Sequence, residues 1–450
     1  MWLLVARAGK TVSLAAAPRR LRATPHEIAG ARVLIPLTHP VHRRMVVGSG
    51  LVDLMTAHGL HVMCEESPPA GSPFRRWLRG GPMRTASYVS REGEGQSYRY
   101  KLARRLAKRQ RLEIGCLRAL RAVTDPEGVA ARLEARLPID ANATRLIDST
   151  DPDVVLVPTF LHTGDETEII KAARAQDIPV VALVSSWDTL TCKGGFLVRP
   201  DRLMVWGQAS REHALTLHGF RAEQIDVVGP PHFDAYAVPL PAADAPRPYI
   251  FFAGTSLSYM PEETALVRYL AAEVHRLSPG LTVWYRPHPR NAGRSFTDLL
   301  DAPGLALDSA TAKGFDADAV RLRQTLDQSR CLVSFFSTLV IEAALRRVPS
   351  AIVAFGQATG GAESGYVDRP VGALADQTRF DHMREVLRWP GILTSKNPMD
   401  LVKDVLDQSR WRGSPILDDL QIAAQRVARC DGQAQQRIVA ALGEVLAHGR

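Results

Sequence analysis

Short apolar runs alternate with stretches of helical spacing through the first half of the chain. The runs RVLIPL (residues 32–37), DVVLV (153–157) and PVVALV (179–184) are almost continuous. Strands that are covered on both faces have this character, and such strands form parallel sheets. Intervening stretches such as residues 46–58 have the periodicity of amphipathic helices. The alternation predicts an α/β domain over residues 27–240.

A proline-rich linker separates this domain from a second one. Residues 238–247 (VPLPAADAPR) combine three prolines with small residues and have no periodicity. The alternation then restarts with YIFFA (249–253) and LTVWY (281–285). We predict a second domain over residues 247–415, and a helical segment over residues 416–450 that packs back against the first domain. The expected fold is two Rossmann-like α/β domains facing each other across a cleft.

The composition excludes several classes of protein. Aromatic residues make up only 6% of the chain, which argues against a base-stacking surface for nucleic acid. Five scattered cysteines without CxxC spacing argue against a disulfide scaffold and a zinc site. In residues 1–26 the basic cluster follows the apolar part, the reverse of a secretory signal. We expect residues 1–26 to be a disordered extension and the protein to be cytoplasmic.

The net charge of +9 is concentrated in one stretch. Residues 75–111 hold 12 Lys and Arg against two Glu, and residues 101–123 have helical apolar spacing with arginines on the other faces. A basic amphipathic helix suits an anionic membrane surface. Nucleic acid would also be attracted, and a solvated helix face is the alternative. We favour an anionic membrane surface, on the inner face of the membrane, and expect no nucleic-acid partner.

Two polar loops of the second domain carry groups that bind phosphate. The first, RPHPR, follows residues 281–285, and its two prolines hold the backbone extended. Arg286, His288 and Arg290 are thereby presented from a stiff loop. Guanidinium groups bind phosphate through paired hydrogen bonds, so this loop predicts a phosphate site. A proline-rich turn with solvated arginines is the alternative.

The second loop opens a helix within CLVSFFSTLVIEAAL (residues 331–345). Ser337 and Thr338 stand at the predicted helix start, where free N–H groups and the positive end of the helix dipole suit an anion. Ser337 also fits a simple N-cap. Glu342 lies one turn further on, where it would reach a ribose hydroxyl or remain a solvated helix residue.

Small residues follow the strand predicted at residues 249–253. Gly254, Thr255 and Ser256 let a ligand approach the backbone closely, although a plain turn has the same composition. We assign them to the same nucleotide-binding wall as the two polar loops.

The first domain offers titratable groups at its strand ends. His39 and His42 follow residues 32–37, and Asp188 follows residues 179–184. An imidazole can take a proton from an acceptor hydroxyl because its pKa lies near the working pH, and Asp188 is a further candidate base. Nothing in the sequence chooses among the three, and a structural histidine is the alternative. No third ligand is spaced with the histidines, so no metal site is predicted.

Together these features resemble the two-domain nucleotide-sugar glycosyltransferases of the GT-B fold. More narrowly, they resemble bacterial surface-polysaccharide enzymes, the group of CDP-glycerol glycerophosphotransferases and of sialyl- and Kdo-transferases with an HP motif. The resemblance covers residues 31–355. Its most specific parts are residues 200–234, which end in VVGPPHFD, and the loop SWDTLTCKGG (186–195).

The resemblance implies a role for each donor-side residue. His288 matches the HP motif that contacts the donor phosphate. Ser337 and Thr338 match the paired hydroxyls that hold the same phosphate, and Glu342 matches a position near the ribose. The UDP-N-acetylglucosamine 2-epimerases share the architecture, but their Ser-Gly-Gly helix start is absent at residues 334–338.

The function implied is transfer of a sugar or sugar-like group from a nucleotide-activated donor to a hydroxyl of a surface glycan or lipid-linked acceptor. By the resemblance His39 or His42 is the base, and Asp188 remains the other candidate. We expect no cofactor and no bound metal, because protein cations neutralise the leaving phosphate. The alternatives are a nucleotide-sugar epimerase of the same fold and a non-catalytic GT-B-like protein that binds glycan or nucleotide.

Overall fold

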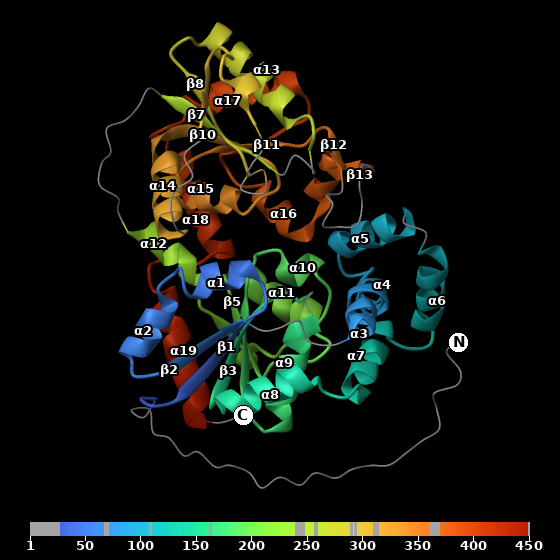
Figure 1. Cartoon of the computed structure of the whole chain (residues 1–450). Helices are drawn as coiled ribbons and strands as arrows, with labels where there is room; N and C mark the ends of the chain where they lie inside the picture. Colours follow the sequence, from blue (N-terminus) through green and yellow to red (C-terminus); the bar gives the residue numbers. More distant parts are fainter. Residues whose placement is uncertain are drawn as a thin grey trace.

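The computed structural model of the protein describes residues 28–66, 72–107, 110–161, 164–238, 248–255, 260–288, 291, 295–308, 315–359 and 370–448. These residues form two α/β domains, each built on a parallel six-stranded sheet, and Figure 1 shows one domain above the other. The predicted fold class is thereby confirmed. The extension predicted over residues 1–26 lies outside the described residues. Within them, no helix is long and apolar enough to cross a membrane.

The first sheet has the strand order β2-β1-β3-β4-β5-β6. β3 and β4 are buried along their whole length because apolar clusters cover both faces of the sheet, which explains their continuous apolar sequences. The strands are β1 (Arg32–Leu37), β2 (His61–Glu66), β3 (Val154–Thr159), β4 (Val180–Val184), β5 (Arg202–Val205) and β6 (Ile225–Val227). The helices are α1 (Pro40–Val46), α2 (Leu51–Ala57), α8 (Ala141–Thr150), α9 (Gly164–Ala175), α10 (Thr189–Cys192), α11 (Gln208–His218) and α12 (Asp234–Ala237).

The helix predicted over residues 46–58 is wrong at its start. α1 ends at Val46, and α2 begins at Leu51 after the run Gly-Ser-Gly. Glycine is the poorest helix former after proline, so these residues break the helical stretch in two. The shorter α1 therefore stands by itself at the carboxyl end of β1.

The second sheet has the order β14-β11-β10-β7-β8-β9, and a separate two-stranded antiparallel ribbon joins β12 to β13. The strands are β7 (Tyr249–Ala253), β8 (Thr282–Arg286), β9 (Leu305–Leu307), β10 (Ser329–Ser334), β11 (Ser350–Val353), β12 (Gln357–Thr359), β13 (Pro370–Ala373) and β14 (Ile392–Ser395). The helices are α13 (Glu263–Leu277), α14 (Phe315–Gln328), α15 (Leu339–Leu345), α16 (Asp381–Val386) and α17 (Pro398–Gln408).

Each sheet has a switch point, where the strand order reverses. In the first sheet β2 lies on one side of β1 and β3 on the other; in the second, β8 lies on one side of β7 and β10 on the other. Ligands of open α/β sheets bind outside the carboxyl ends of the strands at such points. The segments that follow β1, β3, β7 and β10 therefore lie where a ligand is expected.

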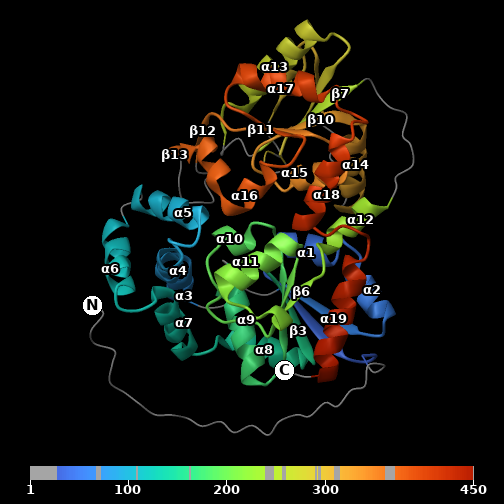
Figure 2. The same cartoon turned by 180° about the vertical axis from the view of Figure 1, so that it is seen from behind.

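A helical insert separates β2 from β3. It consists of α3 (Pro73–Leu78), the π-turn η1 (Arg79–Met83), α4 (Arg84–Ser90), α5 (Gln96–Ala107), α6 (Arg111–Arg121) and α7 (Pro126–Arg136). The single basic helix predicted over residues 101–123 is thus two helices, α5 and α6. Figures 1 and 2 show the insert beside the first domain, with α5 reaching α16 of the second. There the Asp381 carboxylate accepts from the Ser97 backbone N–H at 3.1 Å, and the Ser97 hydroxyl accepts from the Asp381 N–H at 3.0 Å.

Much of the positive charge in the insert is neutralised within the fold. Arg79 is buried and pairs with Glu134 at 2.6 Å and with Glu168 at 2.5 Å. Arg91 pairs with Glu127 at 2.6 Å. These carboxylates lie outside residues 75–111, so the charge surplus within that stretch overstates its attraction for an anion. The membrane contact of residues 75–111 stays a prediction.

The C-terminal segment ties the two domains together. The helical segment predicted over residues 416–450 forms two helices, α18 (Ile416–Val427) and α19 (Ala434–His448). α18 packs on α15 of the second domain, and α19 packs on the first sheet (Figure 1). The buried Asp234 carboxylate accepts from the backbone N–H groups of Ala434 and Gln435, each at 2.9 Å, and so satisfies the start of α19.

Replacing Asp234 by Ala should lower the free energy of unfolding by about 1–2 kcal/mol, because two N–H groups at a helix start lose their acceptor. Urea unfolding monitored by circular dichroism measures the change. The control is Glu223→Ala, which removes an exposed carboxylate paired with Arg221 and should change stability by less than about 0.5 kcal/mol. Equal effects of the two substitutions would contradict the capping role.

Candidate functional site

A cavity of about 230 Å³ lies between the two domains. We call it the interdomain cavity. Its walls come from the first domain at several strand ends and from the second domain at α15. The lining residues are Val41, Arg44, Met45, Phe160, Ser185, Ser186, Trp206, His232, Thr338 and Glu342.

The first domain supplies its wall from the carboxyl ends of β1, β3, β4, β5 and β6. Phe160 follows β3, Ser185 and Ser186 follow β4, and Trp206 follows β5. His232 lies in the 3₁₀ turn η3 (Pro231–Phe233) after β6, against the Trp206 ring. Because all five strands are parallel, these segments gather at one edge of the sheet.

The second domain supplies Thr338 and Glu342, which the sequence predicted for the nucleotide site. Glu342 is buried, and the hydroxyl of Tyr236 on α12 donates to its carboxylate across the domain boundary. Burial raises the pKa of Glu342, while Arg44, the Tyr236 hydroxyl and Arg286 oppose the rise. Arg44 from the first domain and Arg286 from the second therefore act electrostatically on the same carboxylate.

The predicted donor loops follow three neighbouring strands. Thr255 lies just past β7, Arg286 ends β8, and Ser337 follows β10, at the switch point of the second sheet. The Ser337 hydroxyl accepts from the Leu339 N–H at 3.3 Å, but the N-cap of α15 is Thr338, whose side chain makes no capping hydrogen bond. His288 is half-buried beyond β8. Arg290 and Ser256 lie outside the described residues.

A buried carboxylate that the sequence did not single out organises the loop after β7. Glu263 accepts from the Thr255 backbone N–H and from the Tyr285 hydroxyl, each at 2.6 Å. A Cβ on Gly254 would lie 2.5 Å from this carboxylate, which is why the position requires glycine. Burial raises the pKa of Glu263 to about 7, although both donors oppose the rise.

The two histidines after β1 lie near the cavity without lining it. His39 caps α1, and its Nδ1 accepts from the Val41 N–H at 3.1 Å. A neutral His39 therefore carries its proton on Nε2. His42 is fully buried, with Nδ1 3.3 Å from the Thr38 hydroxyl and its ring stacked on Phe160.

Asp188 lies in the loop after β4, at the contact with α16, and is not among the residues that line the cavity. Burial acts to raise the pKa of Asp188, but Lys193 at 3.0 Å, with His382 and Ser186, outweighs it and holds that pKa well below the usual range. Such a carboxylate is a weak base. Thr191 of the same loop meets His382 Nδ1 at 2.8 Å, so the loop joins the two domains.

Two titratable residues that line the cavity were not predicted from the sequence. Arg44 stands on α1, two residues after His42, and His232 lies inside the VVGPPHFD passage. Burial lowers the pKa of His232 to about 3, with a further contribution from Arg44, so its imidazole is neutral at physiological pH. His232 Nδ1 is buried and has no hydrogen-bond partner among the described residues. The passage itself was the signal, but only the fold shows which of its residues faces the cavity.

A metal centre was not expected. Among the described residues, no group of three or more His, Cys, Asp or Glu side chains is arranged to hold a metal ion.

Comparison with known proteins identifies the fold. No protein-family model matches the chain, and no curated protein sequence matches it. Among solved structures, the chain is similar to a UDP-N-acetylglucosamine 2-epimerase of Listeria monocytogenes, with a TM-score of 0.54, 13% identity, and coverage of 92% of this chain and 96% of that one. The MnaA protein of S. aureus, solved with UDP, has a TM-score of 0.51 and 12% identity, with coverage of 92% of this chain and 96% of that one. The kitacinnamycin glycosyltransferase has a TM-score of 0.51 and 12% identity, with coverage of 93% of this chain and 99% of that one. Identities this low show the fold alone: the chain has the GT-B architecture.

The raised pKa of Glu263 predicts a pH-dependent stability. The folded state retains this proton from the ordinary carboxyl value of 4.5 up to about 7, so the free energy of unfolding falls over that interval and levels off above it. In Glu263→Gln this contribution disappears. The difference in the free energy of unfolding between the wild type and the variant should therefore change between pH 4.5 and 7. Urea titrations across that range measure it. Glu273→Gln changes a half-buried glutamate of the same helix that pairs with Arg276, and should keep the wild-type slope; identical slopes for all three proteins would contradict the assignment.

Proposed function

We propose that the protein is a GT-B glycosyltransferase that moves a sugar or sugar-like group from a nucleotide-activated donor to an acceptor hydroxyl. One observation carries the proposal. The interdomain cavity joins Thr338 and Glu342, on the predicted donor side, to polar strand ends of the first domain. A transferase needs this arrangement, because donor and acceptor must meet where both domains contribute.

Donor binding is assigned to the switch point of the second sheet. The diphosphate would lie across the segments after β7, β8 and β10, with Arg286, His288 and Arg290 supplying charge, and the hydroxyls of Ser337 and Thr338 supplying hydrogen bonds. Glu342 is buried beside Tyr236, and we expect the ribose or the transferred group to lie near it. These cations would stabilise the leaving diphosphate without a metal ion.

We propose His232 as the base that deprotonates the acceptor. Its imidazole lines the cavity and is neutral, so a ring nitrogen is available for the acceptor proton. The lowered pKa makes His232 a weak base, and the negative charge of a bound donor would raise that pKa again. The three residues favoured by the sequence fit this role less well. His39 Nδ1 is engaged by the backbone, His42 lies behind Phe160, and the Asp188 carboxylate is neutralised by Lys193.

The second candidate function is a nucleotide-sugar epimerase. The structural similarity to the Listeria epimerase favours it, since the same cavity could bind one nucleotide sugar and change its configuration. An epimerase converts its substrate with no acceptor present, whereas a transferase requires one. The narrower resemblance to glycerophosphotransferases and to sialyl- and Kdo-transferases, and the surface-glycan or lipid-linked acceptor, remain proposals.

Nucleotide binding should depend on Arg286. We expect one of CMP, CDP, UDP and GDP to raise the melting temperature of the wild type, because a ligand that binds the folded state stabilises it. Arg286→Met should weaken this nucleotide at least about tenfold, through loss of charge-assisted bonds to phosphate. The control Arg268→Met removes an exposed arginine of the same domain that pairs with Asp298, and should leave the shift unchanged. No shift with any nucleotide would remove the donor-site proposal.

Loss of the base should slow turnover without weakening nucleotide binding. In His232→Asn we expect kcat to fall about 10²- to 10⁴-fold, while the melting-temperature shift with the nucleotide persists. Product formation is measured with and without acceptor alcohols. A variant with unchanged kcat would refute the role of His232, and conversion of the sugar without any acceptor would establish the epimerase instead.

A further inference from the structure

The interdomain cavity has room for one ring of a substrate. Its volume of about 230 Å³ lies below the roughly 300–1,000 Å³ of pockets that enclose a drug-sized ligand. Of the described residues, none in the segments after β7 and β8 lines it, although the proposed donor site uses both. The cavity therefore holds only the part of a substrate that reaches between the domains, and its walls determine the chemical class of that part.

The charges of the cavity wall oppose each other. Arg44 and Glu342 line it from the two domains, and Arg44 acts to lower the pKa of the Glu342 carboxylate, which burial raises. His232 is neutral because burial lowers its pKa to about 3. A charged ligand group would compete with one member of the Arg44 and Glu342 pair, whereas a neutral group leaves both in place. The wall therefore favours a neutral ligand group.

Ser185 is a buried polar residue of this wall, directly after β4, with an exposed fraction of only 4%. Its backbone N–H donates to the Thr159 carbonyl at 3.0 Å, but its hydroxyl oxygen has no hydrogen-bond partner among the described residues. The hydroxyl of the neighbouring Ser186, by contrast, bonds to Asp188. A buried hydroxyl without a partner is costly, so its position at a cavity wall indicates that a ligand supplies the bond.

Trp206 links Ser185 to His232. The indole Nε1 of Trp206 donates to the carbonyl of Val184, immediately before Ser185, at 2.7 Å. The His232 ring packs edge-on against the same indole, with 5.6 Å between the ring centroids. His232 Nδ1, like the Ser185 hydroxyl, is buried without a hydrogen-bond partner in the described part of the chain. Two polar atoms are thus fixed around one apolar ring, which suits a ligand that has both hydroxyl groups and an apolar face.

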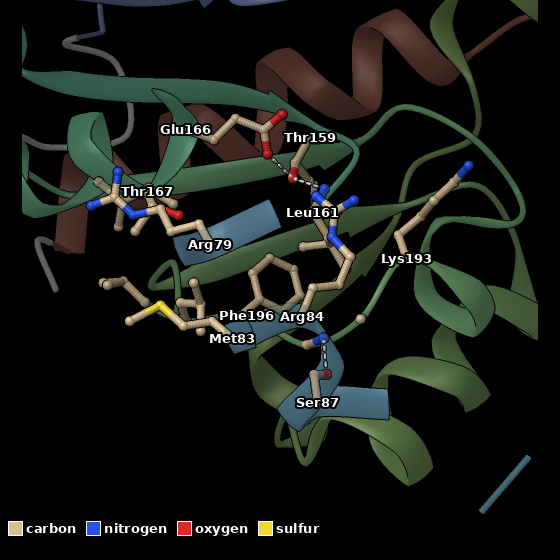
Figure 3. Close-up of a pocket in the computed structure, with 15 residues that line it drawn as sticks. Arg79, Met83, Arg84, Ser87, Thr159, Leu161, Glu166, Thr167, Lys193 and Phe196 are labelled. Carbon is tan, nitrogen blue, oxygen red and sulfur yellow. Dashed lines mark hydrogen bonds between the residues drawn. The ribbon is translucent and has the colours of Figure 1, made fainter. Parts of the chain in front are cut away.

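Phe160 adds apolar surface to the wall from the turn after β3. Figure 3, a close-up of a neighbouring pocket, shows the hydrogen bond that fixes this turn, in which the Thr159 hydroxyl donates to the Glu166 carboxylate at 2.5 Å. The same carboxylate accepts from the Phe160 N–H at 3.3 Å. Leu161 has a φ of 61°, a left-handed conformation that is costly for a bulky residue and persists only where its surroundings hold it. The wall is therefore built before a ligand binds.

We propose that Ser185, Trp206 and His232 form a subsite for a neutral polyol ring, in which the Ser185 hydroxyl bonds to one ligand hydroxyl and His232 faces another. From the second domain, Thr338 lines the same cavity and adds a further hydroxyl. The inference rests on the proposed function, because that function makes the polyol part of a substrate. The ring belongs either to the acceptor or to the sugar of the donor, and the chemistry that recognises it is the same.

Binding of methyl glycosides tests the subsite. The probes are the uncharged methyl glycosides of glucose, galactose and N-acetylglucosamine, with methyl glucuronide as the charged reference and cyclohexanol as the apolar one. Saturation-transfer NMR measures their binding alone and with the preferred nucleotide. We expect at least one uncharged glycoside to bind, and both references to bind more weakly. Failure of all three uncharged glycosides to bind, or tighter binding of either reference, would overturn the proposal.

Ser185→Ala should weaken the bound glycoside about three- to tenfold, because one hydrogen bond is lost. Ser185→Thr keeps a hydroxyl and should bind the glycoside more tightly than Ser185→Ala. The matched control is Ser350→Ala on β11. Ser350 is also fully buried, its hydroxyl has no partner among the residues that the structure describes, and it is not among the residues that line the cavity. Its replacement should leave glycoside binding unchanged.

Urea unfolding separates a binding role of Ser185 from a structural one. Neither serine hydroxyl has a described partner to lose, so Ser185→Ala and Ser350→Ala should both keep the urea midpoint of the wild type or raise it. Weaker glycoside binding at such a midpoint supports the subsite. A lowered midpoint in Ser185→Ala would show that the hydroxyl holds the fold, and equal glycoside affinity in Ser185→Ala and the wild type would show that it binds no ligand; either result overturns the proposal.

Competition identifies the source of the ring and separates this inference from the proposed function. A glycoside displaced by a complete nucleotide sugar, but not by the nucleotide alone, occupies the place of the donor sugar; one that binds together with the nucleotide sugar is the acceptor. If a glycoside binds through Ser185 but no nucleotide binds, the subsite stands and the proposed function fails. If a nucleotide binds and no glycoside does, the proposed function stands and the subsite fails.

Discussion

An apolar cluster shared by both domains holds the carboxyl ends of the two parallel sheets against one another. Trp206 and Phe233 enter it from the first domain, and Ile341 and Met383 enter it from the second. α18 and α19 then cross from one domain to the other and close the boundary. The candidate site depends on this packing, because its residues belong to many separate strands and become neighbours only where the two edges meet.

Polar groups at the boundary are satisfied in pairs across it. Tyr236 donates to Glu342, Thr191 meets His382, and Ser97 and Asp381 cap each other's helices. A buried carboxylate or hydroxyl left without its partner costs about 1–3 kcal/mol, so these pairs fix the relative position of the domains as well as their closeness. Electrostatics at the cavity follow from the same burial, which raises the pKa of Glu342 and lowers that of His232.

The sequence predicted the strands well and the helical insert poorly. β1 and β7 lie at the residues expected, because a strand covered on both faces leaves a continuous apolar run. The insert packs through arginines such as Arg79, whose carboxylate partners are more than 50 residues away. A local count of charge misses these partners, and so it predicts a basic surface for an anionic membrane. The donor loops could be recognised because their residues are adjacent in sequence and end neighbouring strands. The opposite wall could not be recognised, because Arg44 and His232 are far apart in the sequence and come together only at the edge of the folded sheet. Which histidine faces the cavity is decided by burial.

Hydrogen–deuterium exchange with and without the preferred nucleotide tests most directly whether the boundary between the two sheet edges is the functional site. We predict slower backbone exchange at the start of α15 and after β7, together with slower exchange in α1 of the first domain, which faces the same cavity. Slower exchange confined to the helical insert or to the outer helices, with the residues around Thr338 and Arg44 unchanged, would contradict it.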